Sequence, residues 1–84
     1  MFLIKITRKA KRRLKEIKVS SHQIQISNAL EEIAEDLYQG KPLQDELTGQ
    51  YTYRVGVYRI VYKINLKDNT VIIMTAGHRA TVYE

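Results

Sequence analysis

The stretch YTYRVGVYRIVYKINLKDNTVIIMTAGHRATVYE, residues 51–84, decides the fold of this 84-residue chain. Much of it alternates apolar and polar residues in steps of two, and β-branched and aromatic residues predominate, which is typical of half-buried strands. Arginines interrupt this pattern, and a guanidinium on a half-buried sheet needs an anion to offset its loss of water. The stretch therefore predicts a sheet with an anion-binding face, and its arginines are Arg54, Arg59 and Arg79.

Three strands are predicted in this stretch. Gly56 and Val57 make a tight connection after the first, and the polar cluster Lys67-Asp68-Asn69 predicts a hairpin turn after the second. The predicted strands are Tyr51–Val55, Val57–Asn65 and Thr70–Gly77.

The middle strand has two distinct faces. Alternation places Tyr58, Ile60, Tyr62 and Ile64 on one face, and Arg59 shares the other face with Val61 and Lys63. If helices cover the apolar row, Arg59 lies on the open face near the middle of the sheet. Two interpretations then stand side by side: Arg59 binds a ligand anion, or it is a structural arginine paired with Asp45 or Glu46.

The first half of the chain predicts a strand and two helices. Thr7 is a suitable N-cap for the first helix, and Ser20 or Ser21 for the second, with Gly40 after the second helix ends. Residues 41–50 are predicted to form an ordered loop. The predicted elements are a strand over Phe2–Ile6, a helix over Arg8–Ile17 and a helix from Ser20 to about Gln39.

Apolar stripes on the two helices predict how they pack. The first helix has a narrow stripe (Ala10, Leu14, Ile17), and the second has a broader one (Ile26, Leu30, Ile33, Leu37). Lysines on one helix and carboxylates on the other favour an antiparallel hairpin with oppositely charged rims. We therefore expect a single α+β domain over residues 1–84, of order β-α-α-β-β-β, with a small, twisted, mainly antiparallel sheet and both helices on one face.

The net charge of +5 is unevenly distributed. Residues 1–18 hold eight Lys or Arg against one Glu, and residues 19–50 hold one Lys against six acidic residues. Basic segments at both ends of the chain point to a polyanionic partner, and the alternative is a basic helix that merely faces water. The basic residues of the first predicted helix that would meet such a partner are Lys9, Lys11, Arg12, Arg13 and Lys15.

Several classes of function lack the residues they require. There is no Cys, the two histidines are too few for a histidine-based metal site, and no Gly-rich phosphate loop or nucleophile motif is present. We therefore expect neither a metal nor another cofactor. No apolar run approaches the ~18 residues of a membrane span, and the apolar N-terminal residues precede the basic cluster, so a cytoplasmic protein without a membrane partner is expected.

The end of the stretch holds three further candidates. Alternation places Arg79 on the same side as Thr75 and Gly77, where small residues leave room for a ligand. His78 points the opposite way, which favours a histidine at the edge of the core, although a twist at the strand end would make it a proton shuttle. Tyr83 is suited to stack on a base or to hydrogen-bond a phosphate.

The motifs Tyr-Arg-Ile-Val-Tyr (residues 58–62) and Gly-His-Arg (residues 77–79), with Tyr83 near the end, resemble the RelE/ParE superfamily of bacterial type II toxins, and the RelE branch most. The resemblance covers nearly the whole chain. It implies a ribosome-dependent, metal-independent endoribonuclease that cleaves mRNA in the A site, where the 2′-hydroxyl attacks the adjacent phosphodiester. It also implies a cognate antitoxin, in a complex that binds operator DNA.

By position, the resemblance implies a role for each site residue. Arg59 would stabilise the charged phosphorane, and Arg79 would serve the leaving oxygen. Arg54 would promote deprotonation of the 2′-hydroxyl, and Tyr83 would orient the nucleotide. Many relatives carry another Lys or Arg where this chain has Thr52, so the general base stays open. Electrostatic alignment alone, His78 and Glu46 are the three alternatives. A second function, inhibition of DNA gyrase by binding without RNA cleavage, is implied by the ParE branch.

Overall fold

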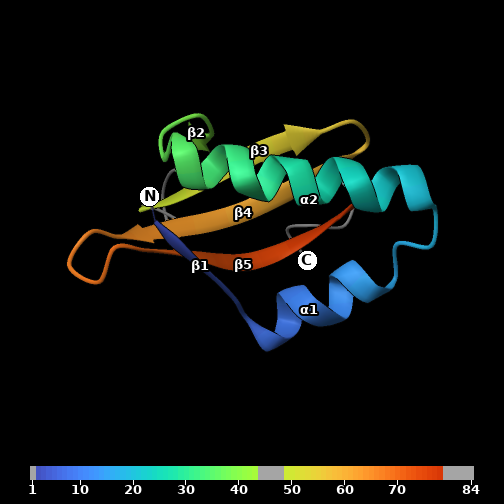
Figure 1. Ribbon diagram of the computed structural model, residues 1–84, viewed down its shortest axis with the longest axis horizontal. Coiled ribbons are helices and arrows are strands. Elements are labelled where there is room, and N and C mark those ends of the chain that lie inside the picture. The colour runs from blue at the N-terminus through green and yellow to red at the C-terminus, as the bar shows by residue number, and fades with distance from the viewer. Residues whose placement is uncertain (1, 44–48, 79–84) are drawn as a thin grey trace.

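In the computed structural model, the protein is a five-stranded sheet with two helices (Figure 1), and residues 2–43 and 49–78 are the part described below. The strand order is β1-β5-β4-β3-β2; β1 runs parallel to β5 and all other neighbours are antiparallel. This confirms the predicted α+β class. The elements are β1 (Leu3–Ile6), α1 (Arg8–Lys15), α2 (Ser20–Glu35), β2 (Lys41–Pro42), β3 (Gln50–Val55), β4 (Tyr58–Asn65) and β5 (Thr70–His78).

Helix α1 begins at the predicted cap. The Thr7 hydroxyl accepts a hydrogen bond from the Ala10 amide (3.1 Å) and donates one to the Met74 carbonyl (2.9 Å), so the cap also ties the helix to β5. The helix ends at Lys15, two residues earlier than predicted. Its apolar stripe is oriented as expected, since Ala10 and Ile17 are buried and Leu14 is partly buried.

Helix α2 differs from its prediction at both ends. Ser20 is its first residue rather than its cap, because Val19 occupies the N-cap position without a side-chain capping bond. The helix ends at Glu35, short of Gln39, although the apolar periodicity continues through Leu37. After Glu35, the amides of Tyr38 and Gln39 bond to Asp36, and the Leu37 carbonyl and Gly40 amide bond to the Tyr62 hydroxyl of β4.

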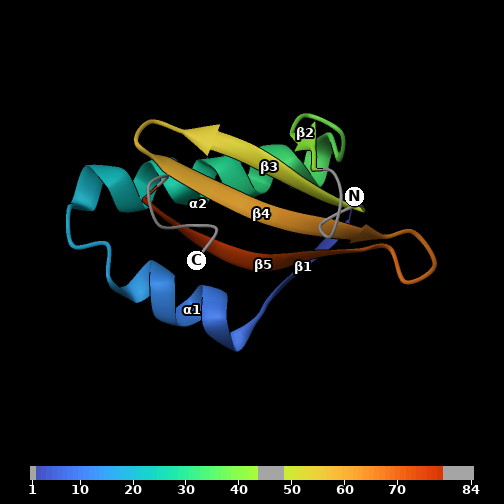
Figure 2. The same cartoon turned by 180° about the vertical axis from the view of Figure 1, so that it is seen from behind.

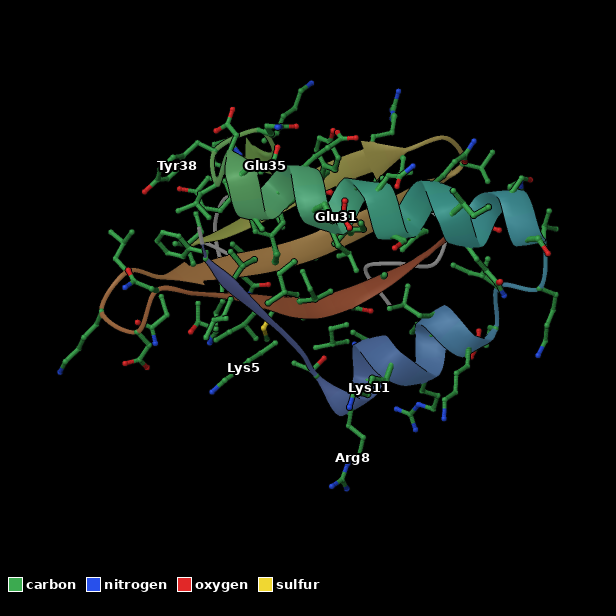
Figure 3. The ribbon with its side chains drawn as sticks, in the orientation of Figure 1. Lys5, Arg8, Lys11, Glu31, Glu35 and Tyr38 are labelled. Atoms are coloured by element: carbon green, nitrogen blue, oxygen red, sulfur yellow. The ribbon has the colours of Figure 1, made fainter. Side chains whose placement is uncertain are left out.

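The predicted ion-paired seam between the helices is wrong. Helix α2 lies across one face of the sheet, whereas α1 packs against β5 (Figures 1 and 2). Arg8 and Lys11 point away from Glu31 and Glu35 (Figure 3), and no ion pair joins the helices within the described residues. Exposed ion pairs contribute less than about 1 kcal/mol, so apolar burial against β5 decides where α1 lies.

Neither helix is long and apolar enough to cross a membrane.

The core lies between the helices and the predicted apolar row of β4. Ile60 and Tyr62 are fully buried, and Tyr58 and Ile64 pack against the same cluster, as alternation predicted. The other buried members of the cluster are Ala10, Ile17, Ile26, Ala29, Ile33, Val71, Ile73 and Ala76.

The Tyr62 hydroxyl connects β4 to the segment that follows α2. It donates to the Leu37 carbonyl (2.8 Å) and accepts from the Gly40 amide (3.0 Å), and the side chain is fully buried. Burial raises the pKa of Tyr62, and the Gly40 amide opposes that rise. A Cβ at Gly40 would lie 2.7 Å from both this hydroxyl and the Thr52 carbonyl oxygen, so only glycine fits.

Strand β2 follows directly from this anchor, within the segment predicted to be a loop. Lys41 pairs with Thr52, Pro42 pairs with Tyr51, and the Leu43 amide donates to the Gln50 carbonyl at 2.9 Å. The prediction of a loop over residues 41–50 is therefore wrong at its start, and residues 44–48 lie outside the described part.

We expect Tyr62→Phe to destabilise the protein by about 2–4 kcal/mol, because it leaves a buried carbonyl and a buried amide without their shared partner. Urea unfolding of Tyr62→Phe and of Tyr38→Phe measures this difference. Tyr38 is 59% exposed, so its variant is expected to stay within about 0.5 kcal/mol of the wild type. Equal stability of the two variants would contradict the role assigned to the Tyr62 hydroxyl.

Candidate anion-binding site

Two predicted site residues face each other on the open face of the sheet. Arg54 of β3 pairs directly with Arg59 of β4, and on its other side Arg59 pairs with Gly77 of β5. Alternation along β4 puts Arg59 opposite the core row, on the face that α2 does not cover (Figure 2). The structure therefore brings Arg54 and Arg59 together as the strand pattern suggested.

Small residues adjoin the arginine pair. Thr75 pairs with Val61 and Gly77 with Arg59, so both share the open face, as predicted from alternation. Among the described residues, no atom would lie within 4 Å of a Cβ placed on Gly77. Within that part of the chain, no side chain therefore fills the space predicted beside the guanidinium.

A cavity of about 310 Å³ opens beside the arginine pair. Six of the described residues line it, and of these three carry a positive charge and none carries a negative one. Such a wall attracts anions, and guanidinium groups suit the geometry of phosphate oxygens. The lining residues are Gln39, Lys41, Thr52, Tyr53, Arg54 and Arg59.

Like charges that face each other directly across a sheet are destabilising. Arg54 is exposed and Arg59 is half-buried, so water screens the repulsion between them only in part. An anion in the cavity would turn this repulsion into attraction on both sides. The pair therefore suits the binding of an anion.

Four residues from the sequence analysis lie outside the described residues. Arg79 and Tyr83 follow the end of β5, and the carboxylates considered as partners of Arg59, Asp45 and Glu46, lie between β2 and β3. Their roles stay predictions.

His78 lies on the opposite face from the arginine pair. It pairs with Tyr58, with ring centroids 6.4 Å apart, and Tyr58 also bonds to His22 through its hydroxyl (2.9 Å to Nδ1). This is the orientation that alternation predicted for a histidine at the edge of the core. A second cavity, of about 190 Å³, lies beside it and is also lined by Arg13 and Glu16.

The basic residues of α1 form a separate surface. Arg13 is half-buried and the other predicted members are exposed, and Arg8 and Lys11 point outward from the molecule (Figure 3). This surface belongs to α1, which packs against β5, and lies away from β3 and β2 (Figure 2). The exposed members are Lys9, Lys11, Arg12 and Lys15.

Tyr53 connects the edge of the cavity to α2. Its hydroxyl donates to Glu32 Oε2 at 2.5 Å. This bond, with a smaller contribution from burial, raises the pKa of Tyr53 to about 12. Strand β3, which carries Arg54, is therefore held to the helix layer on its core side.

Comparison with known proteins identifies similar chains. Residues 4–83 match the family described as ParE toxin of the type II toxin–antitoxin system parDE. Toxin RelG of Mycobacterium tuberculosis is 45% identical over 49 residues, a match that covers 58% of this chain but only 56% of that protein's length.

Solved structures of similar fold cover most of the chain. The toxin–antitoxin complex RelBE2 of M. tuberculosis contains a chain with a TM-score of 0.71 and 33% identity, covering 94% of this chain and 92% of that one. The intact RelBE complex of E. coli contains one with a TM-score of 0.79 and 16% identity, covering 93% and 96% respectively. At that identity, the second likeness concerns the fold alone.

We expect stability to fall as pH rises from about 10 to about 12, in part because of Tyr53. Its folded-state pKa lies above the ordinary value of 10, so over this interval the unfolded chain loses a proton that the folded protein keeps. The contribution is fully present below pH 10. Urea unfolding of Tyr53→Phe across this range should show a shallower decline.

Glu32→Gln tests the cause of this pKa shift. It removes the negative charge of the acceptor, so NMR titration should show the Tyr53 pKa moving down toward 10. An unchanged pKa in Glu32→Gln would contradict the assignment.

Proposed function

This chain belongs to the ParE toxin family of type II toxin–antitoxin systems, and we propose that it acts as a metal-independent endoribonuclease that cleaves mRNA in the ribosomal A site. The observation that carries the proposal is the Arg54–Arg59 pair, which faces a cavity on the open side of the sheet where the described lining residues include three cations and no acid. Preorganised cations of this kind stabilise charge that develops on a phosphate.

In the proposed reaction, the 2′-hydroxyl oxygen of one nucleotide attacks its own 3′ phosphorus. The bond from phosphorus to the 5′ oxygen of the next nucleotide breaks, which leaves a 2′,3′-cyclic phosphate and a 5′-hydroxyl end. One proton leaves the 2′-hydroxyl and one is delivered to the departing oxygen. The chain therefore needs to align the reacting atoms, to stabilise the phosphorane and to assist the two proton transfers.

We assign these tasks by position. Arg59, half-buried in the middle of the open face, stabilises the phosphorane, and Arg54 beside it promotes loss of the 2′-hydroxyl proton by electrostatic attraction. Arg79 serves the leaving oxygen and Tyr83 orients the base, as the family resemblance implies. His78 faces the helix side, so we assign it no proton transfer.

The partners follow from the charge distribution and the family. The basic surface of α1 is proposed to contact ribosomal RNA phosphates, which are the natural ligands of clustered Lys and Arg. A cognate antitoxin is proposed as the neutralising partner, since the RelBE2 structure of M. tuberculosis is a toxin–antitoxin complex. We propose that the complex of the two proteins binds operator DNA.

The second candidate is inhibition of DNA gyrase by binding, and the match to the ParE family favours it. Primer extension on cellular mRNA, together with a supercoiling assay with purified gyrase, separates the two functions. New mRNA 5′ ends with normal supercoiling support the nuclease, whereas intact mRNA with inhibited supercoiling supports the gyrase inhibitor.

We expect Arg59→Ala to lower the rate of mRNA cleavage on programmed ribosomes by roughly 10²–10³-fold, the range seen when one preorganised transition-state donor is removed. Lys67→Ala, in the turn between β4 and β5, is the charge-matched control and should cleave at the wild-type rate. His78→Ala is expected to retain cleavage because His78 lies on the other face. Wild-type cleavage by Arg59→Ala would overturn the assignment, as would complete loss in His78→Ala.

Charge reversal on α1 should weaken ribosome binding without changing the cleavage step. We expect the Lys11→Glu, Arg12→Glu double variant to bind ribosomes more weakly, with a smaller dependence of log affinity on log salt, because fewer counterions are released. Lys67→Glu serves as the control, because it reverses the charge of one exposed lysine that lies outside α1. Binding with an unchanged salt dependence in the double variant would count against RNA contact by α1.

A further inference from the structure

Lys41 belongs to the same face as the arginine pair. It pairs with Thr52 across β2 and β3, and residues that are directly opposed in an antiparallel pair share a face. Thr52 lies two residues from Arg54 and therefore also shares that face. Lys41, Arg54 and Arg59 all line the 310 Å³ cavity.

The spacing of these three residues suits one shared ligand. Directly opposed residues such as Arg54 and Arg59 have Cβ atoms about 5 Å apart, and diagonal neighbours such as Lys41 and Arg54 lie about 7–8 Å apart. Lys and Arg side chains are long enough to reach a common anion across these distances. Thr52, which lies between them, is uncharged, so it adds neither attraction nor repulsion to the site.

The backbone of Lys41 is held on both sides. The preceding residue, Gly40, is bonded to the buried Tyr62 hydroxyl, and the Leu43 amide bonds to the Gln50 carbonyl. A cation on a fixed backbone loses less conformational freedom on binding than one on a free loop. Lys41 is therefore placed in advance at the rim of the cavity.

We propose that Lys41 is a third phosphate-binding residue of this site, and that it contacts the RNA backbone beside the scissile phosphate. This inference rests on the proposed function for the identity of the anion. The cavity volume is at the lower end of the range for ligand pockets, which fits a nucleotide better than an isolated ion. Thr52 of β3 is uncharged, and the directly opposed Lys41 of β2 thus provides a positive charge at this position.

The test measures RNA affinity and cleavage for the full-length protein and three variants. The binding probe is a short single-stranded RNA with 2′-O-methyl groups, which removes the attacking hydroxyl and blocks cleavage. Lys41→Ala should bind it about tenfold more weakly, as for loss of one charge-assisted hydrogen bond, with a salt slope smaller by about 0.7. Lys41→Arg should stay within about twofold of the wild type.

Lys5→Ala is the matched control. Lys5 is also an exposed lysine on an edge strand, but β1 lies four strand spacings from β2, roughly 19 Å at about 4.8 Å per spacing. Its variant should bind RNA like the wild type. Equal RNA affinities for Lys41→Ala and Lys5→Ala would overturn the proposal.

Cleavage on programmed ribosomes separates this proposal from the proposed function. If the wild type cleaves mRNA and Lys41→Ala cleaves at the same rate with subsaturating protein, Lys41 is excluded while the nuclease function stands. If RNA binding depends on Lys41 but the wild type does not cleave, the site is correct and the nuclease function fails. Absence of both binding and cleavage in the wild type overturns both.

A protein carboxylate is the competing anion, and antitoxin binding tests for it. Lys41→Ala should keep wild-type affinity for the cognate antitoxin. A loss of antitoxin affinity with unchanged RNA affinity would overturn the assignment to RNA.

Discussion

The buried hydroxyl of Tyr62 is the constraint on which the rest of the structure depends. A hydroxyl in the core requires hydrogen-bond partners, and here both come from the segment after α2, through the Leu37 carbonyl and the Gly40 amide. The bonds fix where the helix layer returns to the sheet. They also set the start of β2, because Gly40 has no room for a side chain between Tyr62 and the Thr52 carbonyl. A single central strand thereby positions an edge strand two places away.

Strand β4 carries the core and the site on its two faces. Ile60 and Tyr62 are buried against the helices, while Arg59 between the core residues Tyr58 and Ile60 faces the cavity. A β-bulge between Val61 and Tyr62 shifts the pairing with β5, yet the pairing with β3 stays regular through the arginine pair. The rigidity that the core gives to β4 is therefore passed directly to the Arg59 backbone, which favours a preorganised site over an adaptable one.

Much of this arrangement was predictable from alternation and from caps. Arg59 on the open face, His78 on the opposite face and Thr7 at the start of α1 each depend on local rules with a period or a fixed spacing. Lys41 was missed as a site residue because a two-residue strand has no periodicity to read. The predicted end of α2 was too late because the apolar pattern continues through Leu37, whereas the Leu37 carbonyl bonds to Tyr62, a residue distant in sequence.

The predicted seam of opposite charges between α1 and α2 is absent from the described residues because apolar burial outweighs exposed ion pairs. Exposed ion pairs are too weak to override apolar packing, so the stripe of α1 determined its place beside β5. Arg79 and Tyr83 follow the last described strand, so their place beside the arginine pair stays a prediction.

The pairing of β1 with β5 affects how the protein is made. Leu3 to Ile6 of β1 pair with Thr70 to Ile73 of β5, so β1 is synthesised long before the strand with which it pairs. Ala10 and Ile17 likewise belong to a core that includes β5. Long-range parallel pairing closes late in folding. The nascent chain therefore completes its sheet only after β5 has been synthesised, whereas the Arg54–Arg59 pair belongs to the β3–β4 hairpin and does not depend on that step.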